Sequence, residues 1–263
     1  MMIDLPEKIK ALVGSESYSI DPIGMSDSTV LLFADKIVKI QPIHEGAENE
    51  HHIMEWLQGR ISVPRILGYE EQNGKSFLLM TKLPGKISCA DEYMRDPEKL
   101  VSMLADGLQA LWKVDIAQCP YNCSLEKKLL MAEYNVAHNL VNLDHVEPET
   151  FGENGFQNPK RLLEWLYANR PDEDMVLSHG DYCLPNIFGT EEKLSGLIDL
   201  GRTGIADKWQ DIALCYRSLL HNFKGKYAGT SYEGFQEDLL FKKLRIEPDW
   251  DKIRYYILLD ELF

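Results

Sequence analysis

Two short apolar runs enclose a polar loop that constrains the fold more than any other stretch of the chain. The runs at residues 175–177 and 194–200 are typical of short buried strands, and the second contains Asp199 near its end. Asp181 and Asn186 follow the first run, five residues apart. Because polar residues that follow strands gather at strand ends, the pattern predicts that two carboxylates and one amide converge.

This spacing suits phosphoryl transfer, which requires positioned charges more than covalent chemistry from the protein. Asp181 is the candidate base, which would accept or orient the proton of an attacking hydroxyl. Asn186 and Asp199 are the candidate ligands of Mg²⁺, and His179 is expected to brace the loop. The alternative is a polar loop that contains these residue types by chance, and three spaced matches between two strands disfavour it.

The length and the pattern of the chain predict an α+β fold with two unequal lobes. A chain of 263 residues with 44% hydrophobic content buries a substantial core. Near Pro84 the pattern changes from strand-like alternation to helical periodicity. We therefore expect a nucleotide-binding lobe at residues 1–82 and a catalytic and substrate-binding lobe at residues 83–263.

The smaller lobe is predicted to be a five-stranded antiparallel sheet with a helix packed on it, and the larger lobe to be mostly helical. In the smaller lobe we expect helices at 6–13 and 46–59, and strands at 17–23, 29–34, 37–41, 66–70 and 76–81. In the larger lobe we expect helices at 97–114, 125–140, 159–169, 208–221 and 249–262, interrupted only by the two motif strands.

A lysine and a glutamate are predicted to pair between the third strand and the second helix. Strand alternation puts Lys39 on the face opposite Val38 and Ile40, and helical spacing puts Glu50 in the middle of an apolar stripe. A buried carboxylate is costly unless it is paired, so Lys39 is its expected partner and the expected ligand of nucleotide phosphates. The alternative is a solvated lysine and a half-exposed glutamate.

Gly24, Met25 and Ser26 lie between two predicted strands, where small residues allow backbone N–H groups to approach phosphate oxygens. An ordinary hairpin turn uses the same residue types, and on this evidence alone the two readings are equally good.

Charge and cysteine content limit the partners. The chain has 28 Lys and Arg against 42 Asp and Glu, a formal net charge of −14. Such a surface repels nucleic acid and anionic membranes and attracts cations, although acidic charge often serves only solubility. Five cysteines without CxxC pairs favour reduced thiols. Without a leader-like segment or a run as long as a membrane span, the protein is expected to be cytoplasmic.

Two acids at the end of the last predicted helix oppose the helix macrodipole, which favours cations at that position. Asp260 and Glu261 continue the apolar stripe of Ile253 and Ile257, so one of them is expected to face inward, toward a cleft for ammonium groups. A frayed, solvated terminus is the alternative.

The chain resembles the aminoglycoside 3'-phosphotransferases, which share the protein-kinase-like fold, over nearly its full length. The likeness rests on residues 24–26, 38–40, 178–181, 198–202, 206–209 and 255–263. It implies ATP-dependent phosphorylation, with Mg²⁺, of the 3'-hydroxyl of kanamycin- or neomycin-type antibiotics, and hence resistance. The residue roles that it implies agree with those given above for Asp181, Asn186, Asp199 and Lys39.

The resemblance also implies where the two substrates bind. The backbone from Thr81 to Leu83 would meet the purine, with Ile37 and Ile198 beside it. Ile37 replaces an aromatic residue of the family, so the choice between ATP and GTP stays open. Asp260, Glu261 and the carboxylate of Phe263 would form the pocket for the cationic drug.

The segment at residues 144–153 is also acidic, and either a lid over the drug or a solvated loop fits it; Glu149 is its candidate contact. Arg202 and Arg217 would orient carboxylates or phosphates, although structural ion pairing explains them equally well.

Other functions remain as alternatives. A kinase of choline, homoserine or a macrolide would use the same motif, but the acidic terminus argues against it. A nucleotide-binding pseudokinase would be expected to lack at least one of the four motif residues, and none is missing: Lys39, Asp181, Asn186 and Asp199 are all present. A protein kinase is disfavoured because no long activation segment precedes Asp207. We expect a monomer or a weak homodimer.

Overall fold

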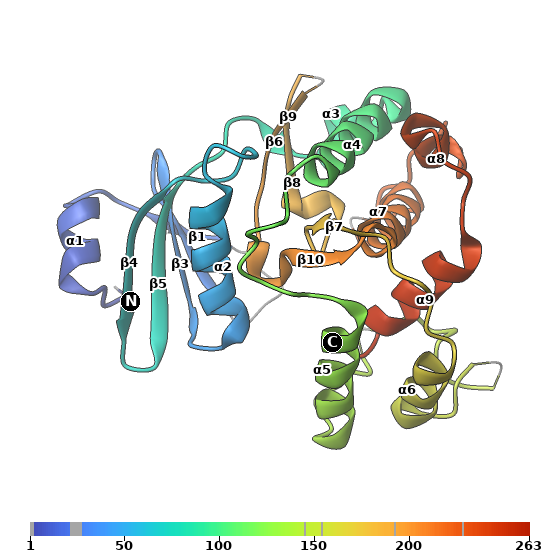
Figure 1. Cartoon of the computed structure of the whole chain (residues 1–263). Coiled ribbons are helices and arrows are strands. Elements are labelled where there is room, and N and C mark those ends of the chain that lie inside the picture. Colours follow the sequence, from blue (N-terminus) through green and yellow to red (C-terminus); the bar gives the residue numbers. More distant parts are fainter. Residues whose placement is uncertain (1–2, 22–27, 145, 154, 192, 228) are drawn as a thin grey trace.

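The computed structural model describes residues 3–21, 28–144, 146–153, 155–191, 193–227 and 229–263, which form two lobes (Figure 1). The smaller lobe contains an antiparallel sheet of five strands in the order β1-β2-β3-β5-β4, as predicted. Its elements are α1 (Glu7–Val13), β1 (Ser19–Ile20), β2 (Thr29–Leu32), β3 (Lys36–Pro42), α2 (Glu45–Leu57), β4 (Ile66–Gln72) and β5 (Lys75–Thr81).

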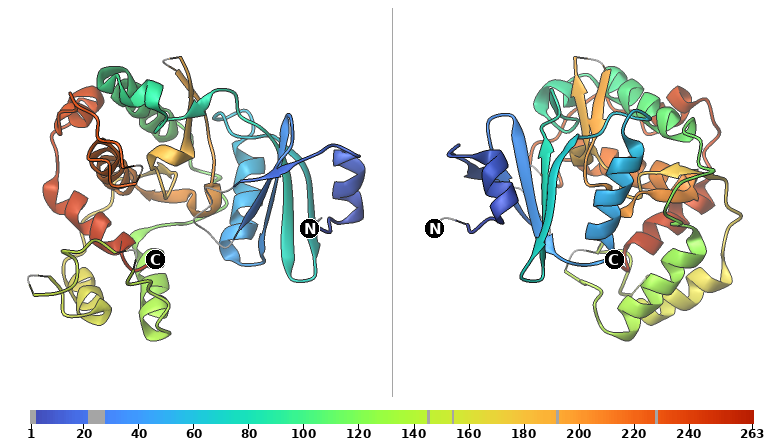
Figure 2. Two further views of the ribbon diagram at one scale, coloured as in Figure 1. Left: turned by 180° about the vertical axis from the view of Figure 1, so that it is seen from behind. Right: turned by 60° about the vertical axis from the view of Figure 1, so that its left-hand side comes forward.

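The two faces of this sheet serve different purposes. Val38 and Ile40 of β3 pack with Ile9 and Val13 of α1 in a separate apolar cluster. Lys39 lies on the other face, which α2 covers, so the predicted alternation along β3 is confirmed. The sheet thus keeps one face for stability and presents the other toward the larger lobe (Figure 2).

The larger lobe is mostly helical, as predicted. Its helices are α3 (Asp91–Met94), α4 (Pro97–Trp112), α5 (Leu125–Ala137), α6 (Pro159–Ala168), α7 (Lys208–Phe223), α8 (Leu239–Leu244) and α9 (Trp250–Asp260). Its strands are β6 (Lys86–Ile87), β7 (Met175–Ser178), β8 (Ile187–Thr190), β9 (Lys193–Leu197) and β10 (Gly204–Asp207), and two 3-10 turns, η1 (Leu184–Asn186) and η2 (Leu200–Arg202), lie between them.

The prediction that only two strands interrupt these helices was wrong. β10 pairs with β7, and β6 and β8 form a small sheet with β9. The helices α3 and α8 were also missed. These elements span two to six residues, too few for a hydrophobic period to distinguish a strand or a helix from a loop.

A single apolar core crosses from one lobe to the other. Ile53, Met54 and Leu57 of α2 belong to the same cluster as Leu177 of β7 and Leu184 of η1. The helix α2 therefore packs on its own sheet and on the larger lobe at once, which fixes its position relative to the motif loop.

Across the described residues, no helix is both long enough and apolar enough to cross a membrane.

Candidate active site

The motif loop that follows β7 is held by a buried carboxylate. Asp211 of α7 accepts the backbone N–H of His179 at 2.7 Å and that of Gly180 at 2.9 Å. Asp211 is fully buried, and burial raises its pKa even though these N–H groups and His179 favour the anion. The backbone just before Asp181 is therefore fixed by the core of the lobe.

The loop also passes very close to the segment after Asp199. Gly180 has φ +85°, and a Cβ there would lie 2.0 Å from the carbonyl oxygen of Arg202, so only glycine fits. The ring of His179 accepts the N–H of Asp181 at 3.3 Å and donates to the carbonyl oxygen of Ile198 at 3.0 Å. These contacts are those expected of a residue that braces the loop.

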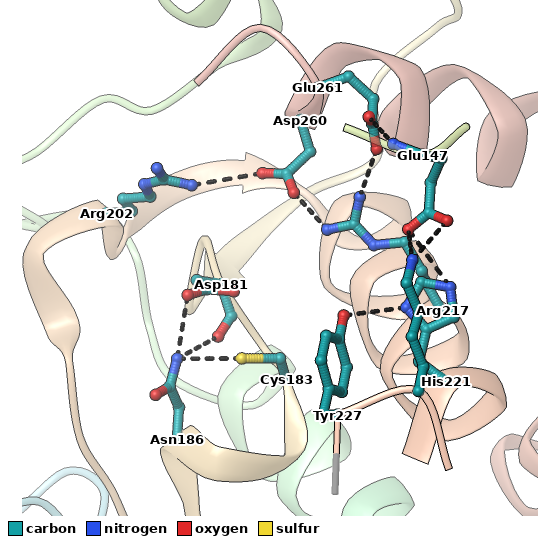
Figure 3. A network of polar contacts seen from close by, with 11 residues as sticks. Glu147, Asp181, Cys183, Asn186, Arg202, Arg217, His221, Tyr227, Asp260 and Glu261 are labelled. Carbon is teal, nitrogen blue, oxygen red and sulfur yellow. Dashed lines mark hydrogen bonds and ion pairs between the residues drawn. The ribbon is translucent and has the colours of Figure 1, made fainter. Parts of the chain in front are cut away.

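Asn186 and Asp181 meet as the spacing predicted (Figure 3). The Nδ2 group of Asn186 donates to Oδ2 of Asp181 at 3.0 Å, to its carbonyl oxygen at 3.1 Å and to Sγ of Cys183 at 3.2 Å. Because these contacts use the nitrogen of the amide, its oxygen is left facing away, where it is suited to a cation.

Lys39 joins the two lobes through two ion pairs. Its Nζ contacts the carboxylate of Glu50 at 2.8 Å and Oδ1 of Asp199 at 2.9 Å. Glu50 is 2% exposed and also accepts a hydrogen bond from Gln41, so the predicted pairing of Lys39 with Glu50 is confirmed. Burial opposes the charge of Lys39, but the two carboxylates raise its pKa above the ordinary value.

Asp199 has a strained backbone and a stabilised negative charge. Its φ and ψ are 57° and 59°, a left-handed conformation that few residues other than glycine adopt. Burial works against the anion, yet Lys39, together with His179 and Arg202, holds the pKa of Asp199 below its usual range. In this conformation, two residues after β9 ends, the carboxylate contacts Lys39.

The acids at the end of α9 are held by arginines rather than frayed, so the solvated alternative was wrong (Figure 3). Asp260 pairs with Arg217 and, at 3.3 Å, with Arg202. Glu261 pairs with Arg217 at 3.1 Å and accepts the backbone N–H of Glu147 at 2.7 Å. The Arg202 guanidinium lies 5.5 Å from the ring of Phe263.

These two arginines set the charge states of the acids. Burial alone would raise the pKa of Asp260, but Arg217 and Arg202 lower it. Burial raises the pKa of Glu261, whose contacts with Glu147 and Arg217 only partly offset it. Arg202 also lies three residues after Asp199, so it connects the motif segment with the acidic terminus.

Comparison with known proteins shows which family has this arrangement. Residues 18–256 match the model of the Phosphotransferase enzyme family. The chain belongs to this family.

Curated relatives of this phosphotransferase are aminoglycoside 3'-phosphotransferases. The protein from Enterococcus faecalis is 40% identical over 218 residues, which cover 82% of this chain and 78% of that protein. The protein from Niallia circulans is 36% identical over 98% of this chain and 97% of its own length. An aminoglycoside phosphotransferase structure from Streptomyces rimosus superposes with a TM-score of 0.81 at 25% identity, covering 97% and 95% of the two chains. The predicted family and kinase-like fold are confirmed.

The residues predicted around the nucleotide lie at the junction of the two lobes. Ile37 pairs with Met80 across β3 and β5, and Thr81 donates its N–H to the carbonyl oxygen of Arg65 at 2.9 Å. Leu83 packs so closely on Gly196 of β9 that a Cβ there would lie 2.7 Å from it. Ile198 donates its N–H to the carbonyl oxygen of Asn186 at 3.0 Å. Gly24, Met25 and Ser26 lie outside the described residues.

Asn186 and Asp199 fit the preferences of Mg²⁺. Both offer oxygen donors, and Mg²⁺ commonly takes only one or two protein ligands beside the phosphates of its substrate. The described residues contain no cluster of three or more His, Cys, Asp and Glu suited to a metal ion.

The acidic segment is anchored by Glu147, which the sequence pattern did not single out. Glu147 contacts Glu261, Lys226 and, at 3.3 Å, His221, whereas Glu149, the candidate drug contact, is exposed. These partners lie far apart in sequence, so no local pattern distinguishes the two glutamates. Asp211 was also missed, although an Asp among the buried apolar residues of α7 is a signal of a required hydrogen bond.

Proposed function

We propose that this phosphotransferase transfers the terminal phosphoryl group of ATP to the 3'-hydroxyl of kanamycin- and neomycin-type aminoglycosides, and so confers resistance. One observation carries the proposal above the others. Arg202, which follows the segment that presents Asp199, reaches Asp260 in the acidic terminus. A cation bound at that terminus would therefore have its hydroxyl groups near Asp181.

In this proposal Asp181 orients the drug hydroxyl and receives its proton as the oxygen attacks in line. Asn186 holds Oδ2 of Asp181 at 3.0 Å, which leaves Oδ1 to face the hydroxyl. Lys39, held by Glu50, neutralises charge on the nucleotide phosphates. Asn186 and Asp199 would hold Mg²⁺, which supplies further neutralisation of that charge.

The nucleotide base would bind where β5 ends. The N–H groups of Thr81 and Lys82 already donate to the carbonyl oxygens of Arg65 and Asp35, at 2.9 and 3.1 Å. The N–H of Leu83 is the next donor along this run, and we assign it to the purine. Ile37 and Ile198 would enclose the ring with aliphatic surface, which discriminates little between ATP and GTP. Gly24, Met25 and Ser26 would cover the phosphates.

The drug would bind through its ammonium groups at the acidic terminus. Asp260, Glu261 and Phe263 are the proposed contacts, with Arg202 orienting Asp260 and Glu149 reaching in from the exposed segment. Because Arg217 already pairs with both terminal acids, the drug would add to or replace an existing cation rather than neutralise bare charges.

A direct assay tests this proposal. Purified protein with Mg²⁺ and ATP should phosphorylate kanamycin, and should leave untouched an analogue that lacks only the 3'-hydroxyl. Mass spectrometry of the product locates the phosphate. Absence of any transfer to kanamycin, or equal transfer to the analogue, would refute the assignment.

Streptomycin is the second candidate substrate, because one relative favours it. The streptomycin 3''-kinase of Streptomyces griseus is 32% identical over 91% of this chain and 89% of its own length. The same assay with streptomycin distinguishes the two, since preference for streptomycin over kanamycin would assign the other drug class.

The remaining parts of the proposal concern organisation. The division between the lobes is placed between residues 82 and 83, just after β5 ends at Thr81. The enzyme would act in the cytoplasm, where ATP is available, as a monomer or a weak homodimer.

A further inference from the structure

A polar side chain of α2 crosses to the segment after Asp199. Asn49 precedes Glu50 in sequence and is 4% exposed. Its Nδ2 group donates to the carbonyl oxygen of Gly201 at 2.9 Å and to that of Thr203 at 3.1 Å. The helix that presents Glu50 to Lys39 is thus hydrogen-bonded directly to the segment that presents Asp199.

The amide of Asn49 has only one suitable orientation. A primary amide has two N–H donors, and both carbonyl oxygens need a donor, so turning the amide over would set its own oxygen against theirs. In the observed orientation Oδ1 is buried and has no hydrogen-bond partner among the described residues. A buried acceptor without a partner costs about 1–3 kcal/mol. A leucine would remove this unpaired oxygen but would take the donor away from the carbonyl oxygens of Gly201 and Thr203, so the asparagine serves the two contacts that it makes with that segment.

The backbones on either side of this contact leave almost no room. Gly46, in the first turn of α2, lies against Gly201 of η2, and a Cβ on Gly201 would be 3.0 Å from the carbonyl oxygen of Gly46. Figure 2 shows α2 between the sheet and the larger lobe. Because no side chain separates these backbones, a shift of α2 moves directly against the segment around Gly201.

The same contact continues to the base. Thr203, whose carbonyl oxygen accepts from Asn49, donates its Oγ1–H to the carbonyl oxygen of His179 at 2.9 Å. The ring of His179 in turn accepts the N–H of Asp181. Three side chains therefore link α2 to the loop that contains Asp181.

We propose that Asn49 is a positioning residue for phosphoryl transfer. Through its two hydrogen bonds it fixes the distance between α2 and the segment from Asp199 to Thr203. Because Glu50 of α2 holds Lys39 of β3, the position of Lys39 relative to that segment is fixed as well. The lysine for the phosphates and the base for the hydroxyl then keep one spacing. The catalytic part of this inference rests on the proposed function, whereas the physical link between the lobes does not.

The chain offers a matched control at the far end of the same helix. Gln58 donates its Nε2 group to the carbonyl oxygens of Met54 and Pro64, at 3.1 and 3.0 Å. It makes the same kind of double contact as Asn49, but both acceptors lie in the smaller lobe. Gln58→Leu therefore removes an equivalent side chain at the C-cap of α2 without breaking a contact between the lobes.

Steady-state kinetics test the catalytic part. Asn49→Leu should lower kcat about tenfold to a hundredfold, because a small misplacement of reacting groups has effects of that size. The KM for kanamycin should stay within about twofold, since both hydrogen bonds of Asn49 go to backbone oxygens of Gly201 and Thr203 and not to the proposed drug contacts. Gln58→Leu should keep the kcat of the wild type. Equal losses of kcat in both variants, or a full kcat in Asn49→Leu, would overturn the proposal.

Hydrogen exchange tests the link without any assumption about the substrate. In Asn49→Leu the amides of residues 45–57 and 199–203 should exchange faster, and in Gln58→Leu those of 199–203 should not change. If Asn49→Leu fails to fold, Asn49→Ala repeats both tests, because it also removes the amide that donates to Gly201 and Thr203. Thr203→Val against Thr203→Ser tests only the onward hydrogen bond to His179, because only valine removes the hydroxyl. Unchanged exchange at residues 199–203 overturns the link. If exchange at residues 199–203 rises in Asn49→Leu but the wild-type protein does not phosphorylate kanamycin, the link stands and only the proposed substrate is refuted.

Discussion

The motif loop and the acidic terminus solve the same problem, the burial of carboxylates, in different ways. Asp211 is satisfied by two backbone N–H groups, whose positions the fold itself determines. Asp260 and Glu261 both pair with the side chain of Arg217, with Arg202 as a further partner of Asp260 and the backbone N–H of Glu147 as a further partner of Glu261. The backbone contacts have no substitute, whereas a cation on a bound ligand can take the place of an arginine. The difference suits a rigid reaction centre beside an exchangeable binding surface.

The largest expected effect lies at the base itself. Asp181→Asn keeps the shape of the side chain but removes its ability to take a proton, so kcat should fall about 10²- to 10⁴-fold. Calorimetry should show that kanamycin and the nucleotide still bind with affinities close to those of the wild type. Normal turnover in this variant would remove Asp181 from its role.

The next effect tests the rigid side of the comparison. Asp211→Asn replaces an acceptor by an amide donor facing the N–H groups of His179 and Gly180. Leaving a buried donor unsatisfied should lower the free energy of unfolding by about 1–3 kcal/mol, and kcat should fall as well. Urea unfolding measures the first, and added kanamycin should stabilise the variant no more than it stabilises the wild type. A larger stabilisation of the variant by the drug would show that this contact is exchangeable after all.

The third effect tests the exchangeable side. Arg217→Met leaves Glu261 and Asp260 with fewer partners, and we expect a loss of about 2 kcal/mol, below that for a fully buried pair. A bound kanamycin should supply the missing cations, so the drug should raise the melting temperature more in this variant than in the wild type. Arg202→Met is the control, because its more exposed pair contributes under about 1 kcal/mol. A smaller drug-induced shift in Arg217→Met would contradict the comparison.

The same contrast explains how far sequence reasoning reached. Alternation along β3 and periodicity along α2 placed Lys39 and Glu50 on facing surfaces, and the structure confirms the pair. These inferences succeed because they depend on neighbours within single elements. Arg217 with Asp260, and Glu147 with Glu261, join segments more than forty residues apart, so spacing gives no information about them. The two-residue strand β6 failed for another reason, since it has no period to detect.

The smallest effect concerns pH, and here the two terminal acids should behave oppositely. The pKa of Asp260 is lowered in the folded protein, so its contribution to stability is present above the unfolded pKa of about 3.9 and is lost as pH falls through the lower folded value. The pKa of Glu261 is raised, so the folded state binds the proton more tightly and stability falls as pH rises from about 4.3 through the folded value.

Two neutral variants separate these contributions. Relative to the wild type, Asp260→Asn should lose most stability at neutral pH and progressively less as pH falls through the lowered folded pKa, below which the wild-type acid is also uncharged. Glu261→Gln should gain stability, relative to the wild type, as pH rises above about 4.3, because it removes the cost of ionising a buried acid. Urea unfolding between about pH 3 and 7 measures both differences. If the stability differences of both variants change with pH in the same direction, then the folded protein does not lower the pKa of Asp260 while raising that of Glu261. The distinct roles assigned to the two acids would then be wrong.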